Sequence, residues 1–266
     1  MTDTTAASRR FEIGRVISGT FGVIGRNIGP FFLMSLLLGG LPNALVSFGQ
    51  AWITNGDKTF SPQMLLVSLV SLVVVIVCAF VLQAAIVHAT VADLNGRRVV
   101  VGDSLKVGLS NWLPLLGLAI LMTLGLALGF VLLIVPGIIL AVMWSVAVPA
   151  KVVEKIGVMD ALQRSRDLTR GRRWAIFGLF VIYVIALWIV EALIMAAVMP
   201  FMLSKGAPTP ETITGFTVVG VATMVASAVI ATITTLISTA GGATLYSELR
   251  GTREGVGPEA MASVFD

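Results

Sequence analysis

Long apolar stretches dominate the chain and are separated by short segments that carry nearly all of its charge. The stretches without Asp, Glu, Lys or Arg cover roughly residues 27–56, 59–92, 107–150, 174–190, 192–204 and 212–247. A membrane-spanning helix needs about 20 mostly apolar residues, and the longer stretches reach that length. The pattern therefore predicts helices that cross a lipid bilayer.

The stretch 107–150 is about twice as long as one span, so we expect it to fold back on itself. Pro136-Gly137 is the predicted corner, because proline breaks a helix and glycine permits a tight turn. A further span begins at Trp174, continues past Glu191 and stops before Pro200. The predicted fold is an all-α polytopic membrane protein with six transmembrane helices near residues 27–52, 62–92, 113–133, 137–151, 174–199 and 216–246.

Six spans leave the N- and C-termini on the same side, and the basic residues predict which side that is. Sixteen of the 18 Lys and Arg residues lie before the first span, in segments 93–106 and 151–173, or after the last span. Only Lys58 and Lys205 lie on the opposite side. Because positive charge is enriched in short cytoplasmic loops, we expect both termini to be cytoplasmic.

Amphipathic segments precede the odd-numbered spans. In 158–173, one helical face carries the apolar and small residues Val158, Ala161, Leu162, Ser165, Leu168 and Thr169. The opposite face carries Asp160, Gln163, Arg164, Arg166, Asp167 and Arg170. Residues 11–25 follow the same pattern, and residues 101–112 form a shorter version. Such faces are typical of helices that lie at the membrane interface.

The boundaries of the even-numbered spans repeat along the chain. Each span ends in an acidic residue followed three positions later by glycine, namely Asp93 with Gly96, Glu154 with Gly157, and Glu248 with Gly251. A second acidic residue follows, namely Asp103, Asp160 or Glu259. Glycine suits a helix C-terminus, and an acidic residue suits the first turn of the next helix. We therefore expect a single membrane domain, 1–266, with three units near 10–96, 101–157 and 158–251 and a tail at 252–266.

The composition narrows the functional classes. The chain is 57% apolar and 12% charged, whereas soluble domains carry about 25% charged residues. One histidine (His88) and one cysteine (Cys78) leave no His-rich metal site, cysteine cluster or disulfide framework. The sequence contains no P-loop, nucleophile elbow or HExxH motif. We expect no catalytic activity, no metal and no cofactor. Nucleic acid is not an expected partner either, because the basic residues flank the spans.

Three polar residues inside predicted spans are candidates for an intramembrane site: Glu191, His88 and Gln83. A carboxyl group in lipid is costly unless it is paired or neutralised, which favours a functional role for Glu191. Its position nine residues before Pro200 instead allows a shallow location near the outer headgroups. His88 suits a structural role or a proton relay. The sixth span carries rows of small and hydroxyl residues, which indicate either helix packing or a polar pathway.

Basic residues cluster next to the fifth span, at Arg164, Arg166, Arg170, Arg172 and Arg173. Juxtamembrane arginines attract anionic lipid, although orientation of the protein alone also accounts for them. We expect these side chains to contact lipid headgroups. The expected partners are membrane lipids, anionic ones in particular. A membrane or cytoplasmic protein and a second copy of the chain are further candidates.

Several segments resemble a bacterial family, the membrane domain of glycerophosphoryl diester phosphodiesterases, which also occurs as a stand-alone protein. The resemblance rests on Pro136-Gly137-Ile138-Ile139, Glu154 and residues 161–178, on the N-terminal segment 11–17 and on the C-terminal segment 246–250. It implies an integral inner-membrane protein. Phosphodiesterase activity is not expected, because the family's catalytic barrel needs paired histidines and this chain has one.

These observations predict a non-catalytic integral protein of the bacterial inner membrane. It would act as a scaffold or accessory protein with a basic cytoplasmic face that contacts anionic lipid. The alternative is a transporter or channel for a small molecule or lipid, with Glu191 and the hydroxyl-rich sixth helix along its pathway.

Overall fold

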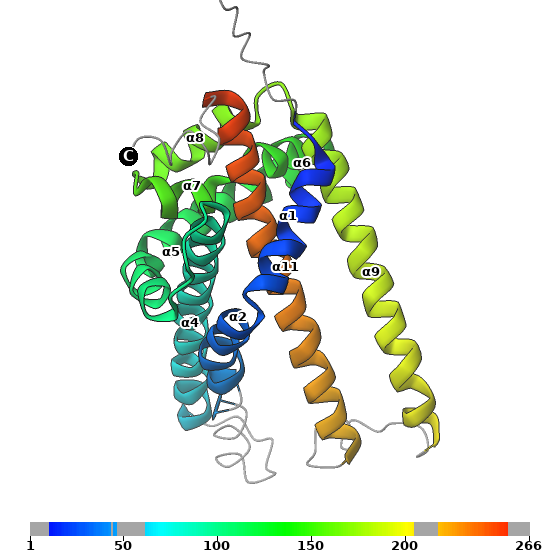
Figure 1. Ribbon diagram of the computed structural model, residues 1–266. Helices are drawn as coiled ribbons and strands as arrows, with labels where there is room; N and C mark the ends of the chain where they lie inside the picture. The colour runs from blue at the N-terminus through cyan, green and yellow to red at the C-terminus, as the bar shows by residue number, and fades with distance from the viewer. Residues whose placement is uncertain (1–10, 44, 47–61, 205–217, 255–266) are drawn as a thin grey trace, which may run out of the picture.

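The described part of the chain is helical. A computed structural model describes residues 11–43, 45–46, 62–204 and 218–254, and no strand occurs within them (Figure 1). The all-α prediction is therefore confirmed. The helices are α1 (Ile13–Arg26), α2 (Ile28–Ser35), the π-helical turn η1 (Leu36–Gly40), α4 (Pro62–Leu94), α5 (Val101–Leu132), α6 (Ile134–Met143), α7 (Ala147–Glu154), α8 (Val158–Thr169), α9 (Arg173–Ser204) and α11 (Val218–Glu254).

Several helices have the length and composition of membrane spans, which supports the prediction of a membrane protein. Within the described residues they are Leu65–Leu94, Val101–Leu132, Ile134–Glu154 and Arg173–Leu193. The pair Ile13–Arg26 and Ile28–Asn43 makes a fifth if a span may bend by 80° at its centre. The later part of the predicted first span, with Trp52, lies outside the described residues, as do Phe216 at the start of the sixth and Glu259 of the repeat pattern.

The bend between α1 and α2 is fixed by Asn27. Its side-chain amide donates to the Val23 carbonyl (3.0 Å) and to Asp93 Oδ1 (2.7 Å) on α4. Before the bend, α1 buries Val16 and Thr20 and packs along α11. A Cβ at Gly19 would lie 2.9 Å from Thr244 Cγ2, so glycine is needed for this approach. The predicted amphipathic helix at 11–25 thus exists, and it lies against α11.

The predicted separate helix at 101–112 is wrong, because α5 runs from Val101 to Leu132 without interruption. The predicted corner at Pro136-Gly137 is also displaced. The chain turns at Leu133, which is extended, and Pro136 lies in the first turn of α6. A proline is tolerated there, since the first-turn N–H groups of a helix have no intrahelical partner.

Two glycines of α5 bring α6 close after this turn. A Cβ at Gly125 would lie 2.4 Å from the Trp144 ring, and one at Gly129 would lie 2.9 Å from Leu140. Gly137 packs in turn against Phe130. The Gly125–Gly129 pair is therefore used for packing within the chain.

The helix ends follow the repeat pattern only in part. Gly96 adopts a left-handed conformation (φ +70°), as expected of a C-cap, and Asp103 and Asp160 lie in first turns as predicted. After α7, however, Lys155 takes the left-handed position (φ +52°) instead of Gly157. Gly251 lies inside α11, which continues to Glu254, and α9 continues through Pro200 to Ser204.

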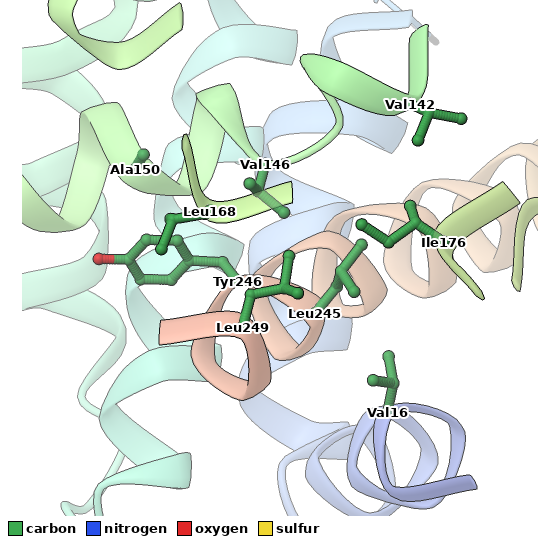
Figure 2. Packing of buried hydrophobic residues seen from close by; sticks show 9 residues of the cluster. All are labelled: Val16, Val142, Val146, Ala150, Leu168, Ile176, Leu245, Tyr246 and Leu249. Atoms are coloured by element: carbon green, nitrogen blue, oxygen red, sulfur yellow. The ribbon is translucent and has the colours of Figure 1, made fainter. Parts of the chain in front are cut away.

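Tyr246, the largest of the fully buried side chains, lies where α8 crosses α7 and α11. Figure 2 shows Tyr246 and Leu249 of α11 beside Leu168 of α8 and Val146 of the turn before α7. The predicted apolar face of α8 is buried at Ala161, Ser165, Leu168 and Thr169. Ser165 Oγ donates to the Met143 carbonyl (2.8 Å) and accepts from the Val146 N–H (3.2 Å). The apolar face of α8 therefore contacts protein, which corrects the expectation that it rests in lipid, and its polar face is exposed.

Candidate functional site

Each acidic residue that ends a predicted even-numbered span pairs with an arginine from another helix. Asp93 lies 2.6 Å from Arg26, Glu154 lies 2.9 Å from Arg164, and Glu248 lies 2.8 Å from Arg15. The partners belong to α1 and α8, the two amphipathic helices. These ion pairs connect the ends of α4, α7 and α11 to the helices that pack on them.

Arg164 is at the centre of a network that joins α7, α8 and α11. Its guanidinium contacts Glu154 and also Glu254, whose other oxygen accepts from Arg250 Nε (2.9 Å). The Tyr246 hydroxyl donates to Glu154 Oε1 (2.7 Å). Burial favours the neutral form of Glu254, but hydrogen bonds from Arg250 and Arg164 outweigh it and lower the pKa of this carboxyl group. The network stabilises charged side chains by pairing them and thus anchors α8.

A second arginine of the predicted cluster is also held within the protein. Arg172 donates to the Thr252 hydroxyl, and its guanidinium carbon lies 6.0 Å from the centre of the Phe11 ring. Nearby, the Arg170 carbonyl accepts from Arg253 (3.2 Å). Arg164 and Arg172 therefore link α8 and the turn after it to other parts of the protein, and their contact with lipid headgroups stays a prediction.

The other three arginines of the cluster surround a cavity at the corner between α8 and α9. Gly171 makes this corner possible, because its φ of +84° is a conformation that residues with a side chain rarely adopt. The cavity has a volume of about 570 Å³. Its walls are Gln163, Arg166, Asp167, Arg170, Gly171, Arg173 and Trp174. We call it the corner pocket.

The corner pocket has a positive electrostatic character. None of Arg166, Arg170 and Arg173 forms an ion pair with a carboxylate in the described part of the chain. The Nε of Arg173 is buried and has no hydrogen-bond partner there. The pocket also lies at the N-terminus of α9, where the first N–H groups of the helix add partial positive charge. Asp167 contributes one opposing charge, so the chemistry of the pocket suits an anion.

The intramembrane candidates do not form one site. Glu191 is exposed on α9, whereas His88 and Gln83 are half-buried on α4. His88 Nδ1 lies 3.2 Å from Ser104 Oγ of α5, a buried hydroxyl. Among the residues described, no hydrogen bond or ion pair joins Glu191 to either of them, and no group of three His, Cys, Asp or Glu residues could hold a metal ion. His88 thus makes a polar contact between α4 and α5.

The small residues of the sixth predicted span contribute to packing in its second half. Thr239 and Ala243 are buried. A Cβ at Gly241 would lie 3.8 Å from Thr20 Oγ1 of α1. Ser238 is exposed, and the Tyr183 hydroxyl of α9 donates to the Thr234 carbonyl (3.4 Å). The side chains of Ser227, Ala222 and Ala226 lie outside what the structure describes. The described part of this pattern is explained mainly by contacts of α11 with α1 and α4.

Sequence reasoning did not identify Gln163, Asp167 and Trp174 as pocket residues or Glu254 as a partner of Arg164. A signal for the first group was present, because Gly171 interrupts a basic segment between an amphipathic helix and a span. No comparable signal marked Glu254, which is 90 residues away from Arg164 in sequence.

Apolar helices of spanning length define a helical membrane protein, and its basic pocket lies where the short helix α8 meets one of them, α9. The chain belongs to the family described as a domain of unknown function, DUF7847, which matches residues 64–249. The matched residues extend from α4 nearly to the end of α11 and include the corner pocket, whereas α1 precedes them. No curated protein and no solved structure matches the chain.

Proposed function

We propose that this chain is a non-catalytic integral protein of the bacterial inner membrane that serves as a scaffold or accessory protein and contacts anionic lipid through its basic cytoplasmic face. The observation that carries the proposal is the division of the arginine cluster. Arg164 and Arg172 are bound to protein groups, while Arg166, Arg170 and Arg173 surround an open pocket without carboxylate partners among the described residues. Unpaired arginines beside a membrane span attract acidic headgroups.

The proposed topology has six spans, with both termini cytoplasmic. In addition to the helices already named, α11 supplies the sixth span through its residues 218–246, and the bend at Asn27 separates the interfacial α1 from the first span. The distribution of basic residues favours the cytoplasmic side for the corner pocket. Trp174 supports an interfacial position, because this residue is 86% exposed at the start of α9.

The proposed threefold repeat is supported by the order in which the units pack. The first helix of each unit packs on the end of the preceding unit, so that α5 packs on α4 and α8 packs on α7. The first unit completes a ring, since α1 packs on α11, the last helix of the third unit. Ser104 and Ala161 follow the repeated acidic residue in their units, and both are buried. The proposed relationship to the membrane domain of glycerophosphoryl diester phosphodiesterases rests on the sequence segments alone.

The transporter alternative has weaker support. Glu191 follows Arg173 by 18 residues, which is about 27 Å along a helix, close to the thickness of the hydrocarbon core. This distance favours a position near the opposite headgroups if Arg173 marks the inner boundary. Because Glu191 is exposed on α9 and distant in sequence from the polar groups of α4, a scaffold role is preferred.

The proposal is tested by purifying the protein from its membrane in a mild neutral detergent and measuring the lipids that remain bound. We expect anionic phospholipids to be enriched relative to the source membrane, and addition of salt to the wash to reduce the enrichment only in part, because the contacts are partly shielded from solvent. A bound-lipid composition equal to that of the membrane would contradict the lipid-contacting function.

A further inference from the structure

The corner pocket is a defined cavity, which distinguishes it from a diffuse basic surface. Its volume of about 570 Å³ falls within the range of small-molecule sites, roughly 300–1,000 Å³. A diffuse surface attracts anions through long-range charge and needs no cavity. Here Arg166 and Arg170, from α8 and the turn after it, and Arg173, from the start of α9, line one space.

The groups that line the corner pocket match the chemistry of a phosphate group. Arginine presents several N–H donors in a planar fork that fits phosphate oxygens. Arg173 Nε is a buried donor without a partner, and such a donor costs free energy until an acceptor reaches it. The N-terminus of α9 adds the backbone donors and partial positive charge that often bind phosphate. Asp167 offsets one of the three arginines, so the lining keeps a net charge of +2, which attracts the single negative charge of a phosphodiester.

The surroundings of the pocket favour a phosphate that belongs to a lipid. Trp174 forms part of the wall, and its exposed ring stands edge-on to Phe177 at 6.2 Å. Further along α9, Val181, Ile185 and Trp188 are exposed as well. In Figure 1, α9 stands at the edge of the bundle, so an apolar surface continues from the pocket along the helix. A headgroup in the pocket would leave its acyl chains beside this surface.

We infer that the corner pocket is a specific binding site for the phosphate group of one phospholipid headgroup. Arg170, Arg173 and the N-terminus of α9 hold the phosphate, Arg166 contributes from α8, and the lipid chains lie against α9. This inference rests on the proposed function and deepens it, since it replaces a general attraction to acidic lipid by one saturable site.

The test compares two double variants that remove the same charge. Arg170→Gln/Arg173→Gln changes the pocket, whereas Arg97→Gln/Arg98→Gln changes exposed arginines in the segment after α4, away from the pocket. Binding of phosphatidylglycerol is measured by native mass spectrometry in neutral detergent with stepwise addition of lipid. We expect one tightly bound lipid in the wild type and in the control. The pocket variant should bind about tenfold more weakly or worse, since it loses charge-assisted hydrogen bonds to the phosphate.

A separate titration with inorganic phosphate distinguishes the two sources of the ligand. Absence of phosphate binding, together with tight lipid binding, supports a lipid headgroup. Binding of inorganic phosphate that disappears in the pocket variant, without tight lipid binding by the wild type, would identify a soluble phosphate as the ligand and overturn the assignment to a lipid. Arg166→Gln, on the exposed face of α8, provides a second pocket variant if Arg170→Gln/Arg173→Gln fails to fold. Equal lipid binding by the pocket and control variants would overturn the inference.

The two proposals fail in different ways. If the purified pocket variant retains the full enrichment of anionic lipid, the specific site is wrong and the general lipid-contacting face remains. If the wild type shows no enrichment at purification, the proposed function is wrong, while the titration still decides whether the pocket binds phosphate.

Discussion

Arg15 and Glu248 form an ion pair of 2.8 Å across 233 residues of sequence, and it joins the first described helix to the last. The Glu248 side chain is 18% exposed and that of Arg15 is 40% exposed, so water screens the pair only in part. Together with the packing of Gly19 against Thr244, this pair holds α1 along α11. Its contribution to stability is open to direct measurement.

Glu248→Gln should lower the stability of the protein by roughly 1 kcal/mol, because it removes the 2.8 Å carboxylate contact of a part-buried guanidinium. The unfolding temperature in detergent measures the loss. The exchange Arg15→Glu/Glu248→Arg restores the pair in reverse and should recover much of the stability that Arg15→Glu alone removes. Strictly additive effects of the two exchanged residues would show that they are not coupled.

The Arg164–Glu254 contact predicts a loss of stability in acid. Pairing lowers the folded-state pKa of Glu254. The ionised carboxylate therefore contributes fully to the free energy of unfolding above the unfolded-state pKa, near 4.3–4.5. This contribution is lost as the pH falls through the lower folded-state pKa. Unfolding temperatures of the wild type and Glu254→Gln should therefore differ at pH 7 and converge as the pH falls through the folded-state pKa of Glu254. A difference that stays constant across this range would contradict the linkage.

Two glycines of α5 offer a matched pair of substitutions. Gly125→Ala places a Cβ about 2.4 Å from the Trp144 ring, whereas no atom lies within 4 Å of a Cβ at Gly117. Gly125→Ala should destabilise the protein by about 1–3 kcal/mol through overpacking. Gly117→Ala should be neutral or stabilise it by up to about 1 kcal/mol, because alanine favours a helix interior. Similar unfolding temperatures for the two variants would show that Trp144 does not pack on Gly125.

Lys155 ends α7 in a left-handed conformation, at φ +52°. Lys155→Gly should raise the stability by about 1 kcal/mol, because glycine adopts this conformation without the steric cost of a Cβ. Lys155→Ala removes the same charge and keeps the strain, so it controls for electrostatics. Only the glycine variant should unfold at a higher temperature. An equal gain in both variants would attribute the effect to charge.

The proposed orientation is tested by cysteine labelling in a Cys78→Ser background. A cysteine that replaces Arg98 should react with a membrane-impermeant maleimide only after the inner membrane is opened, whereas one that replaces Lys58 should react in intact spheroplasts. The reverse labelling pattern would invert the topology. Labelling of both sites in intact spheroplasts would contradict the six-span arrangement.

Apolar stretch length was sufficient to predict most of the fold. It located α4 and α9 closely, and helical periodicity identified the face of α8 that is buried. Periodicity reports that a face is apolar but does not show whether lipid or protein covers it, so the contacts of α8 with α7 and α11 could not be predicted. The turn at Leu133 was missed because Pro136 is compatible with the first turn of a helix as well as with a break.

The candidate site was predictable in its residues and less so in their roles. All five arginines of the cluster lie in the segment that the sequence indicated, but Arg164 and Arg172 are held by Glu254 and Thr252, which lie at the C-terminal end of α11. Local sequence does not reveal such distant partners. The pocket emerges only when the protein-bound arginines are separated from those left around the cavity.

The contact between α1 and α11 has a consequence for biosynthesis. When α1 leaves the ribosome, its partner helix has not yet been made, and about 233 residues must be translated before Glu248 exists. At 5–20 residues per second this delay lasts roughly 12 to 47 s. During that time the buried face of α1 must be shielded by lipid, by a chaperone or by the insertion machinery. The packing of α1 is therefore completed only after α11 has been made.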